Sequence, residues 1–434
     1  MASPALAPEV RAREVWAWSM YDFANSGYTT VVITAVFGAY FVGVVAKGAP
    51  WATFAWTAAL SASYAAVVLT APLIGAWADV HAAKKRVLAL ATAGCVLFTA
   101  LLAFAAPGAV ALALVLVAAS NYFFGTGENL IAAFLPELAD SNAMGRVSGW
   151  GWSFGYLGGI VSLGLSLAWI SAAQARGEPA AQFVSASMLI TAALFALAAL
   201  PTFLFLRERA RPRDAAVRAT AAWSPVHGTL ERVRETLRRA REFRDLWRFL
   251  TCTLFYQAGI QAVIALAAIY AQEAMRFTTQ QTIVLILVVN LTAAVGAFAF
   301  GYAQDAIGHV RAVALTLLGW IAMVLIAGLA ESRAAFWLAA NLAGLCMGSS
   351  QAAGRAIVGY LSPPGRNAEF FGLWGLAVKS ASIFGPLTYG AATWIFPGQH
   401  RVAIFAVGSY FVVGLVLLAG IDIARGRRAA LAAA

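Results

Sequence analysis

Long apolar stretches separated by short polar ones run through almost the whole chain. A helix that crosses a bilayer needs about 20 mostly apolar residues, and twelve stretches are long enough. Their interiors mix Ala, Leu, Val, Gly and Phe without the alternation of apolar and polar positions that marks a transmembrane β-strand. The pattern therefore predicts an all-α membrane protein with spans near 16–44, 52–78, 87–106, 109–135, 148–173, 183–206, 247–272, 280–302, 311–330, 334–360, 370–396 and 402–422.

Composition supports the membrane assignment. The 434 residues are 62% hydrophobic and only 11% charged, whereas soluble proteins carry about 25% charged residues. Cys95, Cys252 and Cys346 are scattered singly in apolar runs, so neither a disulfide framework nor a metal site is indicated. No Walker loop is present to drive the protein with ATP, and we expect no cofactor and no metal.

One polar, arginine-rich stretch divides the spans into two sets of six. We expect an N-terminal six-helix bundle at 1–206, a linker at 207–246 and a C-terminal six-helix bundle at 247–434. In the linker, apolar residues recur at helical spacing after Ser224 and Pro225. A basic amphipathic helix on the membrane face and a solvated charged linker both remain open.

The basic residues are distributed unevenly between the two sets of loops. With the N-terminus inside, 23 of the 30 Lys and Arg residues fall in cytoplasmic segments and five in outside loops. This asymmetry predicts that both termini are cytoplasmic, in what we expect to be a bacterial inner membrane. The net charge of +11 then indicates contact with anionic lipids rather than with nucleic acid.

The two halves repeat each other at a nearly constant offset. Two pairs of equivalent residues are 226 positions apart, and two other pairs are 227 positions apart. Matched offsets at several places indicate a duplicated six-span unit, which is the architecture of one large class of transporters with sites at the interface of the repeats. The matched residues are Gly75 and Gly301, Asp79 and Asp305, Pro136 and Pro363, and Glu128 and Arg355.

The repeated Gly-x-x-x-Asp loop resembles the signature loop of the major facilitator superfamily. Ala82 stands where the first loop is expected to have glycine, while the second loop keeps Gly308. The resemblance implies two pseudo-symmetric six-helix bundles that alternate between inward- and outward-facing states. It also implies that the loop residues hold the bundles together as a conformational latch, although ordinary helix capping would account for them as well. The expected latch residues are Gly75, Asp79, Lys84, Gly301, Asp305 and Arg311.

Four longer motifs are similar to one subfamily of that superfamily, the autophagy-linked vacuolar amino-acid effluxers of yeast and their bacterial relatives. They are YDFANSGYTT at 21–30, SGWGWSFGYLGG at 148–159, QAAGRA at 351–356 and AEFFGLWGLAVKSASIFGP at 368–386. Two positions depart from the subfamily: Ala258 replaces its usual Asp, and Ala132 lies near where it usually has a polar residue. The resemblance implies transport of a small polar solute, with neutral amino acids favoured.

Four ionisable residues fall inside predicted spans, where a charge is costly without a partner or water. Glu128 and Arg355 occupy equivalent places in the repeat at matched depth, so we predict that they pair across the two bundles. Asp22 is a candidate proton carrier or a structural hydrogen-bonding group. Lys379 is a candidate partner for a substrate carboxylate, for Asp22 or for another acid.

Several amides are further candidates for a substrate or coupling site, or for hydrogen bonds between helices. They are Asn25, Asn129, Gln257, Gln261 and Gln351. The four histidines are dispersed in loops, which argues against a membrane-embedded enzyme. We therefore expect a monomeric secondary transporter or facilitator of a small solute, with protons as a candidate coupling ion. A non-transporting sensor or scaffold of the same fold is the alternative.

Overall fold

The computed structural model describes residues 5–210, 243–273, 275–277, 279–396 and 399–433. Within these ranges it is helical, and its one β-type contact is an isolated bridge between Leu6 and Ala139. The predicted amphipathic helix of the linker lies outside the described residues.

The N-terminal bundle contains six long helical segments. The first runs from Ala12 to Val45 and is composite: α1 (Ala12–Tyr28) continues through the π-helical η1 (Thr29–Ala35), the short α2 (Phe37–Tyr40) and the π-helical η2 (Phe41–Val45). The other five are α3 (Ala52–His81), α4 (Lys84–Leu101), which ends in the 3₁₀ turn η3 (Leu102–Phe104), α5 (Val110–Ala132), α7 (Met144–Ala175) and α8 (Ala180–Phe205). The short α6 (Leu135–Leu138) and the 3₁₀ turn η4 (Ser141–Ala143) connect α5 to α7.

The C-terminal bundle contains six more long helices and a short terminal one. The long helices are α11 (Arg244–Glu273), α12 (Thr279–Ile307), α13 (His309–Leu329), α14 (Arg333–Leu361), α15 (Asn367–Ile395) and α16 (His400–Leu418). The terminal helix is α17 (Ile423–Ala432). Twelve long helical segments in two six-membered bundles, counted among the described residues, confirm the predicted fold class.

Ten of the twelve segments are long and apolar enough to cross a membrane by length and composition, when the described residues are searched. Of the remaining two, α11 and α14, the second is more polar. In α14 almost every residue from Cys346 to Leu361 is buried in the protein, so its Ser, Gln and Arg side chains are shielded from lipid. Helices of this kind span a bilayer when their polar residues face the bundle interior. The protein is an integral, multi-pass membrane protein.

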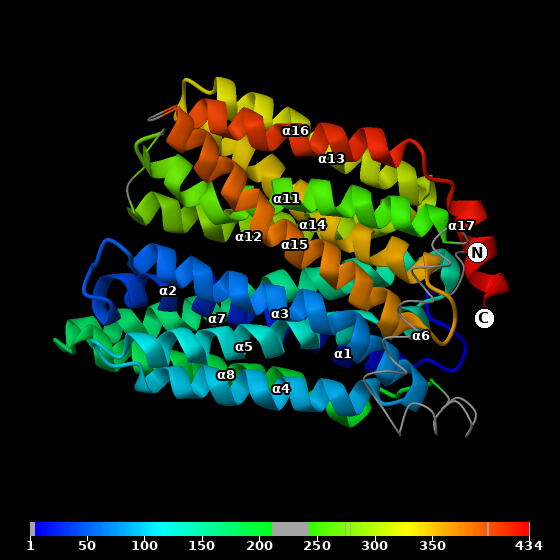
Figure 1. Ribbon diagram of the computed structural model, residues 1–434, viewed down its shortest axis with the longest axis horizontal. Helices are drawn as coiled ribbons and strands as arrows, with labels where there is room; N and C mark the ends of the chain where they lie inside the picture. The colour runs from blue at the N-terminus through cyan, green and yellow to red at the C-terminus, as the bar shows by residue number, and fades with distance from the viewer. Residues whose placement is uncertain (1–4, 211–242, 274, 278, 397–398, 434) are drawn as a thin grey trace.

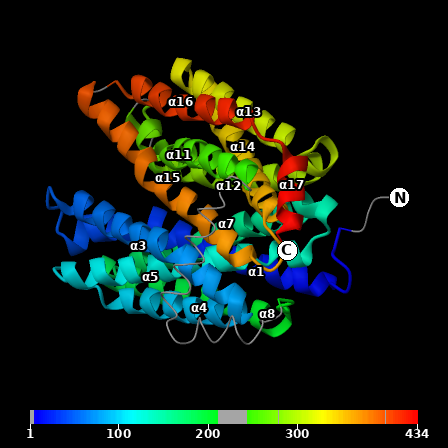
Figure 2. The ribbon, with the colours of Figure 1, turned by 45° about the vertical axis from the view of Figure 1, so that its right-hand side comes forward.

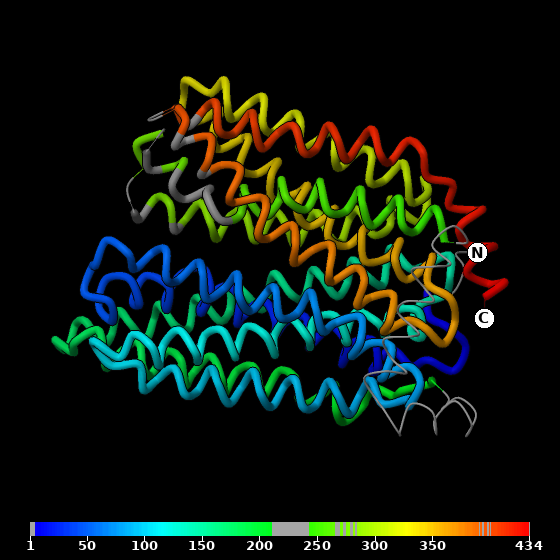
Figure 3. The backbone as a smooth tube through the Cα atoms, in the orientation of Figure 1, coloured from blue at the N-terminus to red at the C-terminus, as the bar shows by residue number. Residues whose placement is uncertain are grey.

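The two bundles lie one above the other in Figure 1 and are joined at one end. Two helix pairs make most of the contact between them: α3 packs along α15, and α7 packs along α12. Further contacts join α7 to α14 and α5 to α15. In Figures 1 and 2, α15 slants from the upper bundle down to the lower one and reaches it near the end where α17 lies. We call this end, which carries the start of α1 and the whole of α17, the terminal end. Figure 3 shows the dark-blue start of the described chain and the red end of α17 at the same end of the molecule.

Candidate functional site

Two carboxylates join the bundles at the terminal end by capping helices of the opposite half. Asp79, at the end of α3, accepts hydrogen bonds from the backbone N–H groups of Ala368 (3.2 Å) and Glu369 (2.8 Å) in the first turn of α15. The first turn of a helix has unsatisfied N–H groups and a partial positive charge, so a carboxylate is stabilised there. Asp79 is 3% exposed, which removes competition from water.

Asp305, at the end of α12, makes the equivalent contact with α7. Its two carboxylate oxygens accept from the backbone N–H groups of Gly145 (2.9 Å) and Arg146 (3.1 Å), and Arg146 Nε also donates to Oδ2 at 2.9 Å. The glycines of the two loops allow the backbones to approach. A Cβ on Gly75 would lie 2.1 Å from Ala368 O, and one on Gly301 would lie 2.7 Å from Gly145 O.

The two basic residues of the expected latch do not cross this interface as side chains. Lys84 is buried and pairs with Glu137 of its own bundle, with its ammonium group over the Phe134 ring. Arg311 is exposed on α13, and its guanidinium makes no ion pair with any described residue. Their assignment to the latch therefore stays a prediction. In this structure the carboxylates and glycines make the contact across the terminal end, with backbone N–H groups and the Arg146 guanidinium as donors.

Between the bundles lies a cavity of about 390 Å³. The charged residues that line it are Asp22, Glu128, Arg355 and Lys379. It extends toward the end opposite α17, past residues such as Phe336 near the start of α14. With the terminal end joined by the two carboxylate caps, this conformation faces the opposite end.

The four charges of the cavity pair across the bundles, but in a different combination from the one predicted. Arg355 Nη1 lies 2.6 Å from Asp22 Oδ2, and Lys379 Nζ lies 2.6 Å from Glu128 Oε2. The predicted pair of Glu128 with Arg355 is wrong for this conformation. Lys379 had three candidate partners, and the structure shows the third of them, an acid other than Asp22, which is Glu128.

The Arg355 guanidinium is almost fully enclosed. It donates to Ser148 twice, from Nε to Oγ (3.1 Å) and from Nη2 to the carbonyl oxygen (2.8 Å). The Trp18 and Trp152 rings lie 4.5 and 5.4 Å from its central carbon, at distances where an aromatic face attracts a cation. Arg355 on α14 thus binds both α1 and α7 of the other half.

A missing side chain makes room for this arrangement. Gly151 of α7 faces the pair, and a Cβ at that position would lie 2.4 Å from Asp22 Oδ2 and 2.5 Å from Arg355 Nη2. Sequence reasoning identified Arg355 and Asp22 but missed Ser148, Trp18 and Gly151 as parts of the same cluster, because their role depends on which helix Arg355 faces.

The second pair is more open to the cavity. The Glu128 side chain is 22% exposed, compared with 10% for Asp22. Lys379 Nζ has Glu128 as its hydrogen-bond acceptor and lies 5.6 Å from the Tyr64 ring centre and 5.3 Å from that of Phe124. A ligand in the cavity therefore reaches Glu128 more easily than it reaches the enclosed Asp22.

The five candidate amides occupy different environments. Asn25, Gln261 and Gln351 line the cavity. Gln257 is buried behind it and donates from Nε2 to Gln351 Oε1 at 2.7 Å, which is a contact within the C-terminal bundle. Asn129 is also buried outside the cavity, its amide atoms have no hydrogen-bond partner among the described residues, and it lies against Gly375 of α15.

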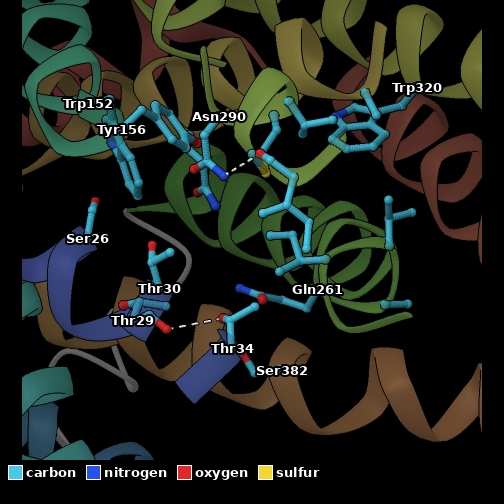
Figure 4. A pocket seen from close by; sticks show the side chains of 18 of the residues that line it. Ser26, Thr29, Thr30, Thr34, Trp152, Tyr156, Gln261, Asn290, Trp320 and Ser382 are labelled. Atoms are coloured by element: carbon cyan, nitrogen blue, oxygen red, sulfur yellow. Dashed lines mark hydrogen bonds between the residues drawn. The ribbon is translucent and has the colours of Figure 1, made fainter. Parts of the chain in front are cut away.

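A row of hydroxyl groups on the first segment also lines the cavity, and sequence reasoning missed it. Figure 4 shows Ser26, Thr29, Thr30 and Thr34 along one side. Thr34 Oγ1 donates to the carbonyl oxygen of Thr29 at 3.1 Å. The π-helical turn of η1 changes the rotation of the segment and brings residues five apart to the same face, which an α-helical pattern does not suggest.

Asp79 gives a testable expectation for the terminal end. Asp79→Asn removes the negative charge at the first turn of α15 and one of two strong acceptors, so we expect a shift toward states open at the terminal end, impaired transport and near-normal expression. Maleimide accessibility of a cysteine placed at Ser362, in a chain freed of native cysteines, measures the shift. Unchanged labelling together with unchanged transport would remove the latch role from Asp79.

Comparison with known proteins gives matches over nearly the whole chain. Residues 11–431 match the family model described as "Vacuole effluxer Atg22 like". Over 412 residues, covering 93% of each chain, it is 27% identical to the "Uncharacterized MFS-type transporter YxiO" of Bacillus subtilis. It is 26% identical over 304 residues to "Autophagy-related protein 22-1" of Penicillium rubens; this match covers 66% of the present chain and 50% of the fungal one.

Two solved structures with this architecture are distant from the chain in sequence. The human organic anion transporter MFSD10 superposes with a TM-score of 0.71 at 18% identity, covering 95% of this chain and 100% of that one. The proton:xylose symporter XylE superposes with a TM-score of 0.70 at 13% identity, covering 93% and 94%. At these identities the likeness is one of fold.

Proposed function

Because this chain belongs to the Atg22-like family of vacuole effluxers, and with it to the major facilitator transporters, we propose that it moves a small polar solute across its membrane by alternating access, with neutral amino acids favoured. The observation that supports this most directly is the cavity between the bundles, which is lined by two cross-bundle ion pairs. A site between two repeats, reached from one end while the other is closed, is the arrangement that alternating access requires.

The Glu128 and Lys379 pair is the part of the site that we assign to the solute. An ammonium and a carboxylate on one molecule are equivalent to this pair in charge, so a zwitterion can bind Lys379 through its carboxylate and Glu128 through its ammonium group. Separating the pair without such a replacement leaves two charges uncompensated in a low-dielectric site, which is costly. A solute that compensates both charges lowers that cost.

We assign a different role to Asp22 and Arg355. Their pair is enclosed by Trp18 and Trp152, and Arg355 is held by Ser148 as well. It holds α14 of one bundle to α1 and α7 of the other in the present conformation, and in the proposal it opens only when the bundles move. Protons remain a candidate for coupling, and Glu128 is the carboxylate better placed to exchange one with the cavity.

We place the terminal end on the cytoplasmic side of the membrane, as the excess of arginine there favours. The conformation described here is then outward-facing. Labelling from outside of a cysteine placed at Arg333, at the opposite end, checks this orientation.

Reconstitution in liposomes tests the function. We expect the purified protein to exchange radiolabelled neutral amino acids across the bilayer, and Glu128→Gln and Lys379→Met each to reduce exchange at least tenfold, because the remaining charge is uncompensated. Lys85→Met, a change at a terminal-end lysine outside the cavity, is the control. A protein that binds neutral amino acids but does not exchange them would favour the sensor or scaffold alternative.

A further inference from the structure

The cavity has two chemically different walls. The N-terminal bundle contributes hydroxyl, amide and charged groups, among them Ser26, Thr29, Asn25 and Glu128. The C-terminal bundle contributes mainly hydrocarbon. Apolar side chains on that side include Val289, Met323, Phe336, Ile404 and Val407, and polar ones such as Gln261 and Asn290 are fewer.

On the C-terminal side the cavity also reaches further from the interface. It is lined by α13, through Trp320, Met323 and Ala327, and by α16, through Ile404 and Val407. Among the described residues that line it, none belongs to α4 or α8, the third and sixth long helices of the N-terminal bundle. The cavity therefore continues into the interior of one bundle and not of the other. We call this extension the side chamber.

The N-terminal interior is occupied by two tyrosines of α1. Tyr21 donates to or accepts from Thr92 of α4 at 2.8 Å, and Tyr28 makes the same kind of contact with Ser120 of α5 at 2.8 Å. The Tyr28 ring stacks on Phe124. The wall of the side chamber includes small residues, Ala327 and Ala343 among them.

Two polar atoms on the chamber wall are already bonded within the protein. Trp320 Nε1 donates to Ser350 Oγ at 3.0 Å, and Tyr270 OH donates to the carbonyl oxygen of Ala327 at 2.9 Å. These two residues therefore present ring carbons to the space. Figure 4 shows Trp320 across the pocket from Ser26, Thr29 and Thr30. Cavities lined by hydrocarbon hold water poorly and accept apolar ligands.

We propose that the side chamber is a subsite for a hydrocarbon substituent of the transported solute, while its polar group stays against the N-terminal wall. The occupant is amphipathic: a zwitterionic or polar head linked to an unbranched, branched or aromatic hydrocarbon group. This rests on the proposed function for the position of the head. Continuity of the chamber with the ion-pair site favours a solute substituent over a lipid chain as its occupant.

A series of probes that differ only in hydrocarbon length tests the proposal. We would measure the concentration needed for half-maximal thermal stabilisation of the purified protein by alanine, 2-aminobutyrate, norvaline and norleucine. We expect affinity to rise about fourfold for each added methylene group, as burial of one CH₂ predicts. Ala327→Leu, which fills the chamber, should leave alanine binding within about twofold and abolish the rise.

Ala322→Leu is the matched control, since Ala322 lies on the same helix and does not line the cavity. Ala343→Leu, from the facing helix, serves if Ala327→Leu does not fold. A flat series in the wild type, or a rise that persists in both filled variants, overturns the proposal.

A second series separates the chamber from the proposed solute class. The same measurement with 1-butanol, 1-pentanol and 1-hexanol needs no zwitterionic head. The amino acids could give no stabilisation while the alkanols show a length dependence that Ala327→Leu removes. That result would support the apolar subsite and reject amino acids as the transported solute. An alkanol effect of equal size in Ala327→Leu and Ala322→Leu reports insertion at the lipid boundary and counts against the chamber.

Discussion

Arg355→Met should destabilise the protein more than any other single change in the cavity, and Asp22→Asn in the same chain should recover much of the loss. Arg355 is 2% exposed and binds Asp22 and Ser148 of the other bundle. Without it, Asp22 is left as a buried carboxylate with no cation in reach, and removal of one partner from such a pair costs about 3–5 kcal/mol. Thermal unfolding of the two single variants and the double variant measures the coupling.

The same design decides between the alternative pairings. We expect a coupling of about 1–3 kcal/mol for Asp22 with Arg355 and for Glu128 with Lys379, and additive effects for Glu128 with Arg355. Coupling between Glu128 and Arg355, with none between Arg355 and Asp22, would restore the pairing suggested by the repeat and reject the one described here. Ser148→Ala provides a control that removes one hydrogen bond of Arg355 and leaves its ion pair.

Gly75→Ala should prevent the terminal end from closing. The added Cβ would lie 2.1 Å from the carbonyl oxygen of Ala368 and 2.5 Å from its carbonyl carbon. Both atoms belong to the backbone of α15, so no side-chain movement relieves the overlap, and the two bundles must separate there. We expect the population to move to the state open at the terminal end, with transport lost to below about one tenth.

Distances between spin labels placed across the terminal end, at Ser141 and Pro364, measure this shift. Gly164→Ala is the matched control: Gly164 also lies within a long helix, and a Cβ there has no atom within 4 Å. Since alanine is favoured over glycine in a helix by about 0.5–1 kcal/mol, the control should be neutral or slightly stabilising. Equal effects of the two changes would show that the overlap at Gly75 is relieved without separation.

The fold could be predicted from the sequence because its main determinant is local. Each span has to satisfy its own backbone in lipid, and this requires a long apolar helix that can be recognised without knowledge of its neighbours. The offset between Asp79 and Asp305 is likewise a local signal, since each residue ends a span in the same way in both halves. The hydrogen-bond partners of these two residues could not be predicted. The partners are backbone N–H groups of another helix, which every residue type carries and which therefore leave no signal in the sequence.

The pairing of the charges could not be predicted for a geometric reason. Equal offset placed Glu128 and Arg355 at similar depth, but depth does not determine which way a helix is rotated. Arg355 points toward α1 and α7 because Gly151 leaves space for it there. The space for this pair thus requires the absence of a Cβ at position 151, and glycine is common in membrane spans wherever helices pack closely. The π-helical turn that brings Thr29 and Thr34 together likewise leaves no periodic signal.

The two carboxylate caps at the terminal end have the form of an isologous contact. The end of α3 caps α15 and the end of α12 caps α7. Each half therefore provides one capping carboxylate and one capped helix, as in a two-fold symmetric dimer. One ancestral six-helix chain with an acid after its second helix would have formed both caps at once by self-association. The cavity breaks this symmetry, because each half contributes one kind of charge: the acids Asp22 and Glu128 come from one side, and the bases Arg355 and Lys379 from the other. A symmetric dimer could not present a polarised site of this kind, so fusion of the two copies is what allowed one face to become acidic and the other basic.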